Sequence, residues 1–433
     1  MERFRTSRRL PRTARVALGV LSAGAALLLA ACSSSSSSAT GGSAGTSASG
    51  AAASTGASSS GTDVAALANA VNQAAAVPSF STYAADYGSK VPGVSNLKGK
   101  KLMIVPGDSA LAACTEIAQA DAALATDVGM VPTIFANQGT TAEHNTAIEN
   151  AIHQGYAAID LGCDYDPTTN APALAAAQKA GIVVAVYGAT QAQAQQTNVQ
   201  YNNVDPYALD ATLAVDQAVS QHNGQPFDAV AITSNAASAT ATMEAAIKAE
   251  LAKTCPKCTL TEVNVEVPQW ATDVAGAVSS ALLQHPDTTV LFPYYAGMLT
   301  YVLQGMQSAH KTTGVTAYLN FGGGTPFIKL QTQEPGKSII QGQLGGYPPW
   351  TGYLMFLQLA RNLTGMAPLG TAQNQVAGPN RLVTPDNAVD VLTTGGNGTD
   401  WVNGFRGLLG LPALSGAALT SAATLGGSMT DQP

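Results

Sequence analysis

From Lys98 onward, short runs of β-forming residues alternate with Ala-rich stretches of helical spacing, and this alternation constrains the fold most strongly. The expected strands are Lys101–Pro106, Val131–Ala136, Ala157–Gly162, Ile182–Tyr187, Asp228–Thr233, Leu260–Val267, Thr289–Tyr294 and Ala317–Phe321. The expected helices are Leu111–Val128, Ala142–Gln154, Ala171–Ala180, Pro206–His222, Ala237–Lys253, Thr272–Leu283 and Met298–Ala309. Strand–helix–strand units at this spacing predict parallel sheets with right-handed crossovers.

The alternation pauses near residues 201–205 and then starts again, which predicts two similar α/β lobes instead of one wide sheet. Gly129, Gly155 and Gly181 stand just after expected helices, where a residue with positive φ commonly ends a helix. Ligands bind beyond the C-terminal ends of parallel strands. Two lobes that face each other would therefore share one cleft.

Residues 1–31 have the pattern of an export signal. Six Arg residues lie among the first fifteen, and the uncharged stretch Val16–Ala31 follows them. A basic start, a short apolar run and small residues before a cleavage site are typical of a secretory signal peptide. The apolar run is too short and too rich in Ala for a transmembrane helix, which needs about 20 apolar residues.

Leu29-Ala30-Ala31-Cys32 resembles the lipobox of bacterial lipoproteins. The resemblance implies that Cys32 becomes the N-terminus of the mature protein and carries acyl chains such as palmitate. An ordinary signal peptide followed by a chance cysteine is the alternative. Arg8-Arg9 suggests twin-arginine export, but Pro11 interrupts the apolar residues that usually follow such a pair.

Residues 32–62 are almost wholly Ser, Ala, Gly and Thr after Cys32, and they predict a disordered tether. Such a segment has too little apolar surface to offset the entropy of ordering. Residues 63–97 contain a helical start followed by Pro and Gly, and are expected to form an irregular lead-in. The lipid and the tether would hold the folded body at the extracytoplasmic face of the cell membrane.

The expected mature chain is strongly acidic. Removing residues 1–31 takes away six Arg and one Glu, which lowers the formal charge from −7 to about −12. Nucleic-acid binding requires clustered Lys and Arg to meet phosphates, and no such cluster follows the signal. Nucleic acid is therefore excluded as a partner.

Cys255-Pro-Lys-Cys258 allows three interpretations. A zinc site would need two further ligands at matching spacing, and the five His residues are scattered singly. A thioredoxin-like site would need the pair at a helix N-terminus after a strand, whereas this pair precedes a strand. A disulfide that clamps the turn is favoured in an exported protein. Cys114 and Cys163 follow the first and third strands, so we also consider a second disulfide between them.

Several local motifs resemble the sugar-type periplasmic binding proteins of ABC transporters, the ribose-binding class. They are the strand entries at Leu97–Lys101 and Ala180–Val184, the Leu282–Asp287 run before Val290–Phe292, and Gly324-Thr325-Pro326 after Ala317–Phe321. Their order extends from about Gly99 to Asp390. The resemblance implies two Rossmann-like lobes joined by three hinge crossings, near Tyr201–Asp205, Gln341–Tyr347 and Gly378–Thr384.

On this resemblance, residues 98–204 and 346–378 form the N-terminal lobe, and residues 205–345 and 379–412 form the C-terminal lobe. Residues 413–433 are expected to be a flexible tail. The family further implies closure around one small-molecule solute, delivery to an ABC permease, no cofactor and no catalysed reaction. We expect a monomer. No constellation in the chain fits a metal site or nucleophilic catalysis.

The charged residues that bind the sugar in ribose-type members are missing from the matching positions of this chain. Aromatic residues stand at several of those positions instead. The candidate ligand-binding residues all stand at strand ends or hinge crossings, and are Asp108, Ser109, Asp164, Tyr187, Asn203, Asp205, Trp270, Tyr294, Tyr295, Gly323, Gln343 and Tyr347. Asp164 and Asp166 have a helix-capping role as the alternative. Trp270 is the strongest aromatic candidate, because its counterpart in the family lies in the cleft.

The resemblance implies solute capture for an ABC importer. Aromatic faces suit the C–H side of a sugar ring, and their polar tips add hydrogen bonds. No Lys or Arg stands at a strand end, which disfavours an anionic ligand and favours a neutral sugar, polyol or sugar-like molecule. A basic ligand is the alternative, because the acidic residues could bind it. The other hypotheses are a tethered sensor for a signalling receptor and a lipid-anchored hydrolase.

If Cys32 is the lipidated residue, Cys32→Ser should release the protein into the medium or leave its precursor uncleaved. Fractionation of cells into membrane and medium, with detection of precursor size, measures this. A processed mutant that still needs detergent to leave the membrane would contradict the lipoprotein interpretation.

Overall fold

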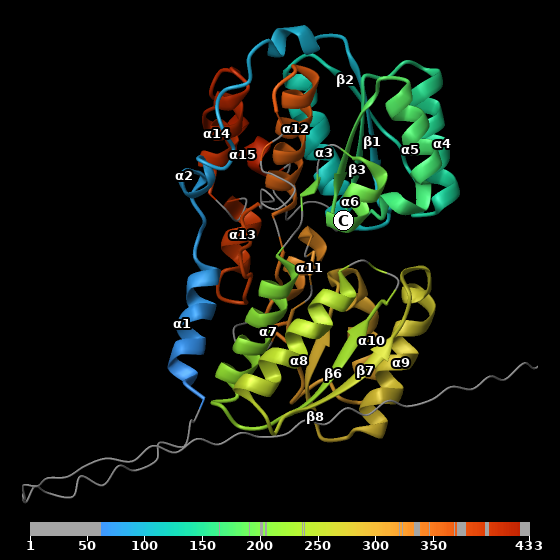
Figure 1. Cartoon of the computed structure of the whole chain (residues 1–433). Coiled ribbons are helices and arrows are strands. Elements are labelled where there is room, and N and C mark those ends of the chain that lie inside the picture. Colours follow the sequence, from blue (N-terminus) through green and yellow to red (C-terminus); the bar gives the residue numbers. More distant parts are fainter. Residues whose placement is uncertain are drawn as a thin grey trace, which may run out of the picture. The chain divides into compact units, whose positions relative to one another are not determined.

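The computed structural model describes residues 62–163, 165–189, 191–199, 202–203, 206–235, 237, 239–319, 321–322, 324–332, 338–345, 347–367, 369, 378–394 and 398–424. Cys32 and the expected signal and tether lie outside these residues, apart from Thr62. Two parallel sheets with helices on their faces make up the described chain (Figure 1). The predicted α/β class with two lobes is confirmed.

The first sheet contains five parallel strands in the order β2-β1-β3-β4-β5. These strands are β1 (Lys101–Pro106), β2 (Val131–Ile134), β3 (Ala158–Gly162), β4 (Val183–Tyr187) and β5 (Asn202–Asn203). Between them run α3 (Ala112–Asp127), α4 (Thr141–His153), the 3₁₀ helix η2 (Pro167–Asn170), α5 (Ala171–Lys179) and α6 (Gln191–Thr197). Each of these strands falls within a few residues of an expected one, except β5, which was expected only as a hinge crossing.

Side-chain alternation along β1 builds a separate core on each face of this sheet. Met103 and Val105 pack with α4 and α5, while Leu102 and Ile104 pack with α3 and α12 (Pro348–Leu363). Figure 1 shows these two helix pairs on opposite sides of the strands. A strand that is buried on both faces is typical of a doubly covered parallel sheet.

The second sheet contains four parallel strands in the order β7-β6-β8-β9. They are β6 (Asp228–Thr233), β7 (Thr259–Asn264), β8 (Thr288–Pro293) and β9 (Thr316–Ala317). The accompanying helices are α7 (Tyr207–Gln221), α8 (Thr240–Thr254), η3 (Val267–Gln269), α9 (Trp270–Gln284), η4 (Ala296–Met298), α10 (Leu299–Ser308) and α11 (Thr325–Gln331). β9 is shorter than expected, because only Thr316 and Ala317 pair regularly with β8.

The described parts of the second and third hinge crossings pair with each other. Gln343 and Val383 exchange two backbone N–H···O bonds of 2.9 Å in an antiparallel bridge. The Asn380 side chain accepts a 3.0 Å bond from the Gly345 N–H and donates to the Asp210 carboxylate of α7. The segments expected as the second and third crossings are therefore adjacent in the structure. In the first crossing, Tyr201, Val204 and Asp205 lie outside the described residues.

The C-terminal helices differ from the expected lobe assignment. Residues 379–412 were expected in the C-terminal lobe, yet the buried residues of α13 (Ala388–Thr394) and α14 (Asp400–Leu408) belong to the core of the first sheet. The cause is aromatic packing, since Trp401 stacks on Trp350 of α12 at 5.4 Å between ring centroids. α15 (Gly416–Ala423) buries Ala423 in the same core, in part of the expected tail.

The expected lead-in is more regular than predicted. It contains α1 (Val64–Ala75), α2 (Phe80–Tyr83) and the 3₁₀ helix η1 (Val94–Leu97). α1 packs on α7 through Val71, which belongs to the core of the second sheet. Tyr87 and Leu97 are fully buried in the core of the first sheet. The lead-in segment therefore contributes buried residues to the cores of both sheets.

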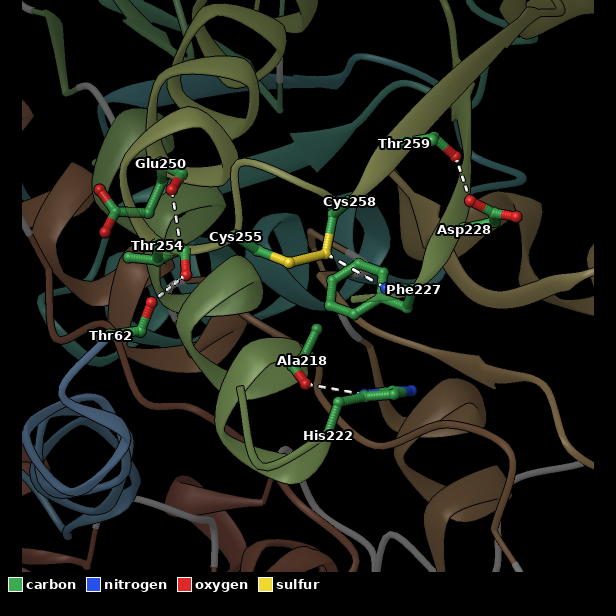
Figure 2. Close-up of a disulfide and its surroundings, with 10 residues drawn as sticks. All are labelled: Thr62, Ala218, His222, Phe227, Asp228, Glu250, Thr254, Cys255, Cys258 and Thr259. Carbon is green, nitrogen blue, oxygen red and sulfur yellow. Dashed lines mark hydrogen bonds between the residues drawn. A yellow bond between two sulfur atoms is a disulfide. The ribbon is translucent and has the colours of Figure 1, made fainter. Parts of the chain in front are cut away.

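Both cysteine pairs are disulfide-bonded in the structure. Cys255–Cys258 closes the turn between α8 and β7, where the Phe227 N–H points at the Cys258 sulfur at 3.3 Å (Figure 2). Cys114–Cys163 joins the first turn of α3 to the residue after β3, with Cα atoms 5.2 Å apart. The glycines expected to end helices with a positive φ are also confirmed. Gly129, Gly155 and Gly181 have φ of 87°, 67° and 79°.

Two carboxyl groups are buried together between α3 and the first sheet. Asp121 and Asp160 are 1% and 2% exposed. Burial raises the pKa of Asp160 to about 7. Burial, followed by the nearby Asp160 carboxylate, raises the pKa of Asp121. The folded protein therefore holds protons here that an unfolded chain, with Asp near pKa 3.9, releases above about pH 4.

This pair should make stability fall as pH rises. A raised folded pKa gives stability that is complete below the unfolded pKa and is lost as the pH rises through the folded pKa. Asp121→Asn removes one of the two charges, so the free energy of unfolding should change less between about pH 4 and pH 8, by at least about 1 kcal/mol. Denaturant unfolding at several pH values measures this. The exposed Asp273→Asn is the control, and equal pH slopes for wild type and Asp121→Asn would contradict the prediction.

Candidate functional site

A cavity of about 320 Å³ is lined by residues from both lobes. On the first lobe, its walls come from the segments that follow β1, β2 and β3, and from the end of β4. On the second lobe, they come from η3, the start of α9, and the segments after β8 and β9. The carboxyl ends of parallel strands thus supply most of the lining, as expected for an open parallel sheet.

The wall after β1 depends on a close backbone approach. A Cβ atom on Gly107 would lie 2.2 Å from the Cys163 carbonyl oxygen, so only glycine fits between β1 and the disulfide. Asp108 follows, half-buried, and its Oδ1 accepts a 2.8 Å bond from the Ala110 N–H. This bond orients the Asp108 carboxylate at the cavity.

The wall after β2 and β3 is polar. His144 Nε2 lies 3.0 Å from the Gly107 carbonyl oxygen, so it acts as the donor there, and its ring meets Tyr165 edge-on at 4.9 Å. Burial lowers the pKa of His144, which keeps its imidazole neutral at pH 7. Asp166 Oδ1 accepts bonds from the Thr168 N–H at 2.9 Å and the Thr168 hydroxyl at 2.7 Å. Asp166 therefore has the capping role considered from the sequence, and its side chain also lines the cavity.

The wall of the second lobe is aromatic. Trp270 and Tyr295 stack with ring centroids 5.7 Å apart. The Trp270 Nε1–H donates to the Val265 carbonyl at 3.1 Å, and the Tyr295 hydroxyl lies 2.9 Å from Thr240 Oγ1. A Cβ on Gly297 would lie 2.7 Å from the Trp270 ring, so glycine is required beside it. These contacts fix the indole in one orientation.

The structure brings together a minority of the candidate residues named from the sequence. Those that line the cavity are Asp108, Tyr187, Trp270 and Tyr295. Asp164, Asp205 and Gly323 lie outside the described residues, as does the side chain of Asn203, whose backbone forms β5. Trp270 is only 6% exposed, so it belongs to the core of the second lobe as well as to the cavity wall.

Four candidates point elsewhere in the described structure. Ser109 Oγ accepts a 3.0 Å bond from the Asn137 N–H, and Tyr294 is fully buried in the second core. The Gln343 amide donates to the Phe327 carbonyl at 2.8 Å and to Gln331 at 2.7 Å, within the hinge. Tyr347 is buried and donates to the Ala423 carbonyl at 2.8 Å. Tyr294 and Tyr347 are therefore packed in the interior, and Ser109 and Gln343 form hydrogen bonds to other protein groups.

The polar residues that sequence reasoning missed follow β2 and β3. They are Gln138, Thr141, His144, Tyr165 and Thr169. The strand-end rule that selected Asp108 applies equally to these segments, so the signal for their position was present. Their identity as lining residues depends on how the loops fold back, which the sequence does not indicate.

Metal ligation has no structural support within the described ranges. These residues contain no group of three or more His, Cys, Asp or Glu side chains that could hold a metal ion. None of the helices built from them is both long and apolar enough to cross a membrane.

The chain belongs to the periplasmic binding protein domain family, whose model matches residues 107–366. Members of this family are solute-binding proteins and not enzymes, and membership implies a location outside the cytoplasm. No curated protein matches the sequence significantly.

Solved structures with this fold include several ABC transporter components. A solute-binding protein from Agrobacterium vitis, with bound allitol, aligns with a TM-score of 0.59 at 18% identity over 68% of this chain and 98% of its own. A 5-methylthioribose transporter solute-binding protein from Thermotoga lettingae gives 0.57 at 15% identity over 75% and 96%. A carbohydrate transporter from Acidothermus cellulolyticus, in complex with myo-inositol, gives 0.55 at 16% over 68% and 96%. At these identities the likeness shows the fold.

Because Trp270 is both core and wall, Trp270→Ala should destabilise the apoprotein. Truncating a buried Trp typically costs about 3–5 kcal/mol of unfolding free energy. Trp270→Phe keeps a ring against Tyr295 and loses the bond to Val265, so it should cost about 1 kcal/mol for that bond and a little more for lost volume. Denaturant unfolding of both variants measures this. Wild-type stability in Trp270→Ala would show that the indole is not packed as described.

Proposed function

We propose that this protein is an extracytoplasmic solute-binding lipoprotein that captures a sugar or sugar-like small molecule and delivers it to an ABC importer. The single observation that carries the proposal is a cavity of small-molecule size at the strand ends of two lobes in a periplasmic binding protein domain. The relatives with bound allitol, D-arabinose and myo-inositol support a polyhydroxylated ligand.

The chemistry of the walls supports the same class of ligand. Trp270 and Tyr295 line the cavity and offer an apolar aromatic surface to the C–H side of a ring or polyol. The carboxylates of Asp108 and Asp166 accept hydrogen bonds from hydroxyl groups, and charge-assisted bonds of this kind are the stronger ones. The described lining contains no Lys or Arg, which disfavours an anionic solute.

Delivery requires a change that the permease can recognise. In hinged two-lobe proteins, a ligand that contacts both lobes favours the closed arrangement, because only that arrangement makes both sets of contacts. The paired crossings at Gln343 and Val383 supply the connection about which such closure would occur. Cys32 would keep the protein beside the permease through its lipid.

A screen of sugars and polyols by thermal unfolding tests the proposal. A ligand that binds only the folded state adds about 2.7 kcal/mol at 100 times its Kd, which raises the Tm by several degrees. Trp270→Phe should bind the same sugar more weakly than wild type, and Trp270→Ala by roughly five- to 150-fold, the loss expected for about 1–3 kcal/mol of ring contact.

Trp401→Ala is the matched control, since Trp401 is fully buried in the first core and does not line the cavity. This variant should be destabilised yet keep wild-type affinity per folded molecule. No Tm increase with any sugar or polyol would contradict sugar capture. Permease and ATPase genes beside this gene would favour import over a signalling role.

A further inference from the structure

The cavity carries two carboxylates and no compensating positive side chain among its described lining residues. Asp108 and Asp166 are the acidic residues, and His144 is neutral at pH 7 because burial lowers its pKa. The segments that contribute these three residues, 107–114, 137–144 and 163–170, contain no Lys or Arg in the sequence. The segments that supply the facing wall, 265–272, 294–298 and 321–328, contain none either.

Among the described residues, no positively charged side chain pairs with either carboxylate. Asp108 accepts from the Ala110 N–H, and Asp166 accepts from the Thr168 N–H and hydroxyl. All of these donors are neutral, and within the described structure neither carboxylate joins an ion pair. All three bonds use Oδ1, so within the described structure the Oδ2 atom of each residue is open to a ligand.

A ligand that fills the cavity takes both carboxylates out of water. Removing an ionised carboxylate from water is costly unless an opposite charge or strong donors replace the lost hydration. Neutral hydroxyl groups provide donors but no charge. A protonated amine provides the charge and up to three N–H donors in one group.

The opposite wall also favours a cation. Trp270 and Tyr295 form a stacked aromatic pair on the second lobe, and the lining contains Phe321 and Phe327 in addition. The faces of aromatic rings attract a positive charge within about 6 Å, most strongly for Trp. The same rings accept the apolar face of a sugar, so the two recognition modes are compatible in one solute.

We propose that the solute of this cavity is a sugar-like molecule that carries a protonated amine, with the ammonium group held by Asp108 and Asp166. The proposal rests on the solute-capture function above and narrows its ligand class. It favours a positively charged solute over a neutral one. It assigns this selectivity to the carboxylates of Asp108 and Asp166.

Calorimetric titration of matched sugar pairs tests the proposal. The probes are glucosamine, galactosamine and mannosamine, each paired with its parent hexose, and N-acetylglucosamine, which has the nitrogen but no charge. At pH 6 the amine of the pair that fits should bind at least about tenfold more tightly than its parent, equivalent to about 1.4 kcal/mol. N-acetylglucosamine should show no such advantage over glucose.

Asp108→Asn and Asp166→Asn test the assignment of the residues. Each keeps a side-chain oxygen for the local N–H bond, so the loop geometry is preserved while the charge is removed. Each should reduce the preference for the amine to about threefold or less, and raising the salt concentration should weaken the wild-type preference. Asp273→Asn, an exposed residue of α9, should leave the preference unchanged.

The outcomes separate this proposal from the function on which it rests. If a parent hexose binds as tightly as its amine, the charge selectivity is wrong and sugar capture stands. If the amine is preferred in both Asp→Asn variants as in wild type, the assignment to Asp108 and Asp166 is wrong. If no sugar of the set binds while the thermal-unfolding screen finds another neutral sugar or polyol that does, the amine proposal is overturned and sugar capture stands.

Discussion

The parallel register of the first sheet is the constraint on which the site depends. Because β1 pairs with β3, and β3 with β4, the chain leaves neighbouring strands at the same edge after Pro106, Gly162 and Tyr187. Backbone hydrogen bonds hold those exits at fixed spacing, so the loops that follow converge without needing contacts of their own. The Gly107–Cys163 approach and the Cys114–Cys163 bond then join two of these loops into one wall.

The two lobes use aromatic side chains for different purposes. In the first lobe, Trp350, Trp401 and Phe405 pack in the interior, where stacked and edge-to-face contacts join α12 to α14. In the second lobe, Trp270 and Tyr295 are equally well packed but also line the cavity. Rigidity in that wall lowers the entropy lost when a ligand binds.

The sequence predicted the regular part of the fold well and the site only partly. β1, β3, β4 and β6 are mostly apolar runs, a signal that depends on neighbouring residues alone. The membership of α14 in the first core depends on a contact between Trp401 and Trp350, which are far apart in the chain. Gln343 and Tyr347 were named as candidates from their places at a hinge crossing, but their hydrogen-bond partners are set by tertiary folding.

The Cys114–Cys163 bond makes the structure of the cavity wall depend on the cellular compartment of the protein. Both cysteines line the cavity, and disulfides form and persist outside the reducing cytoplasm. A chain still awaiting export would present two thiols at this wall, with the start of α3 no longer tied to the end of β3. The mature binding surface is therefore completed only in the compartment where its solute is met.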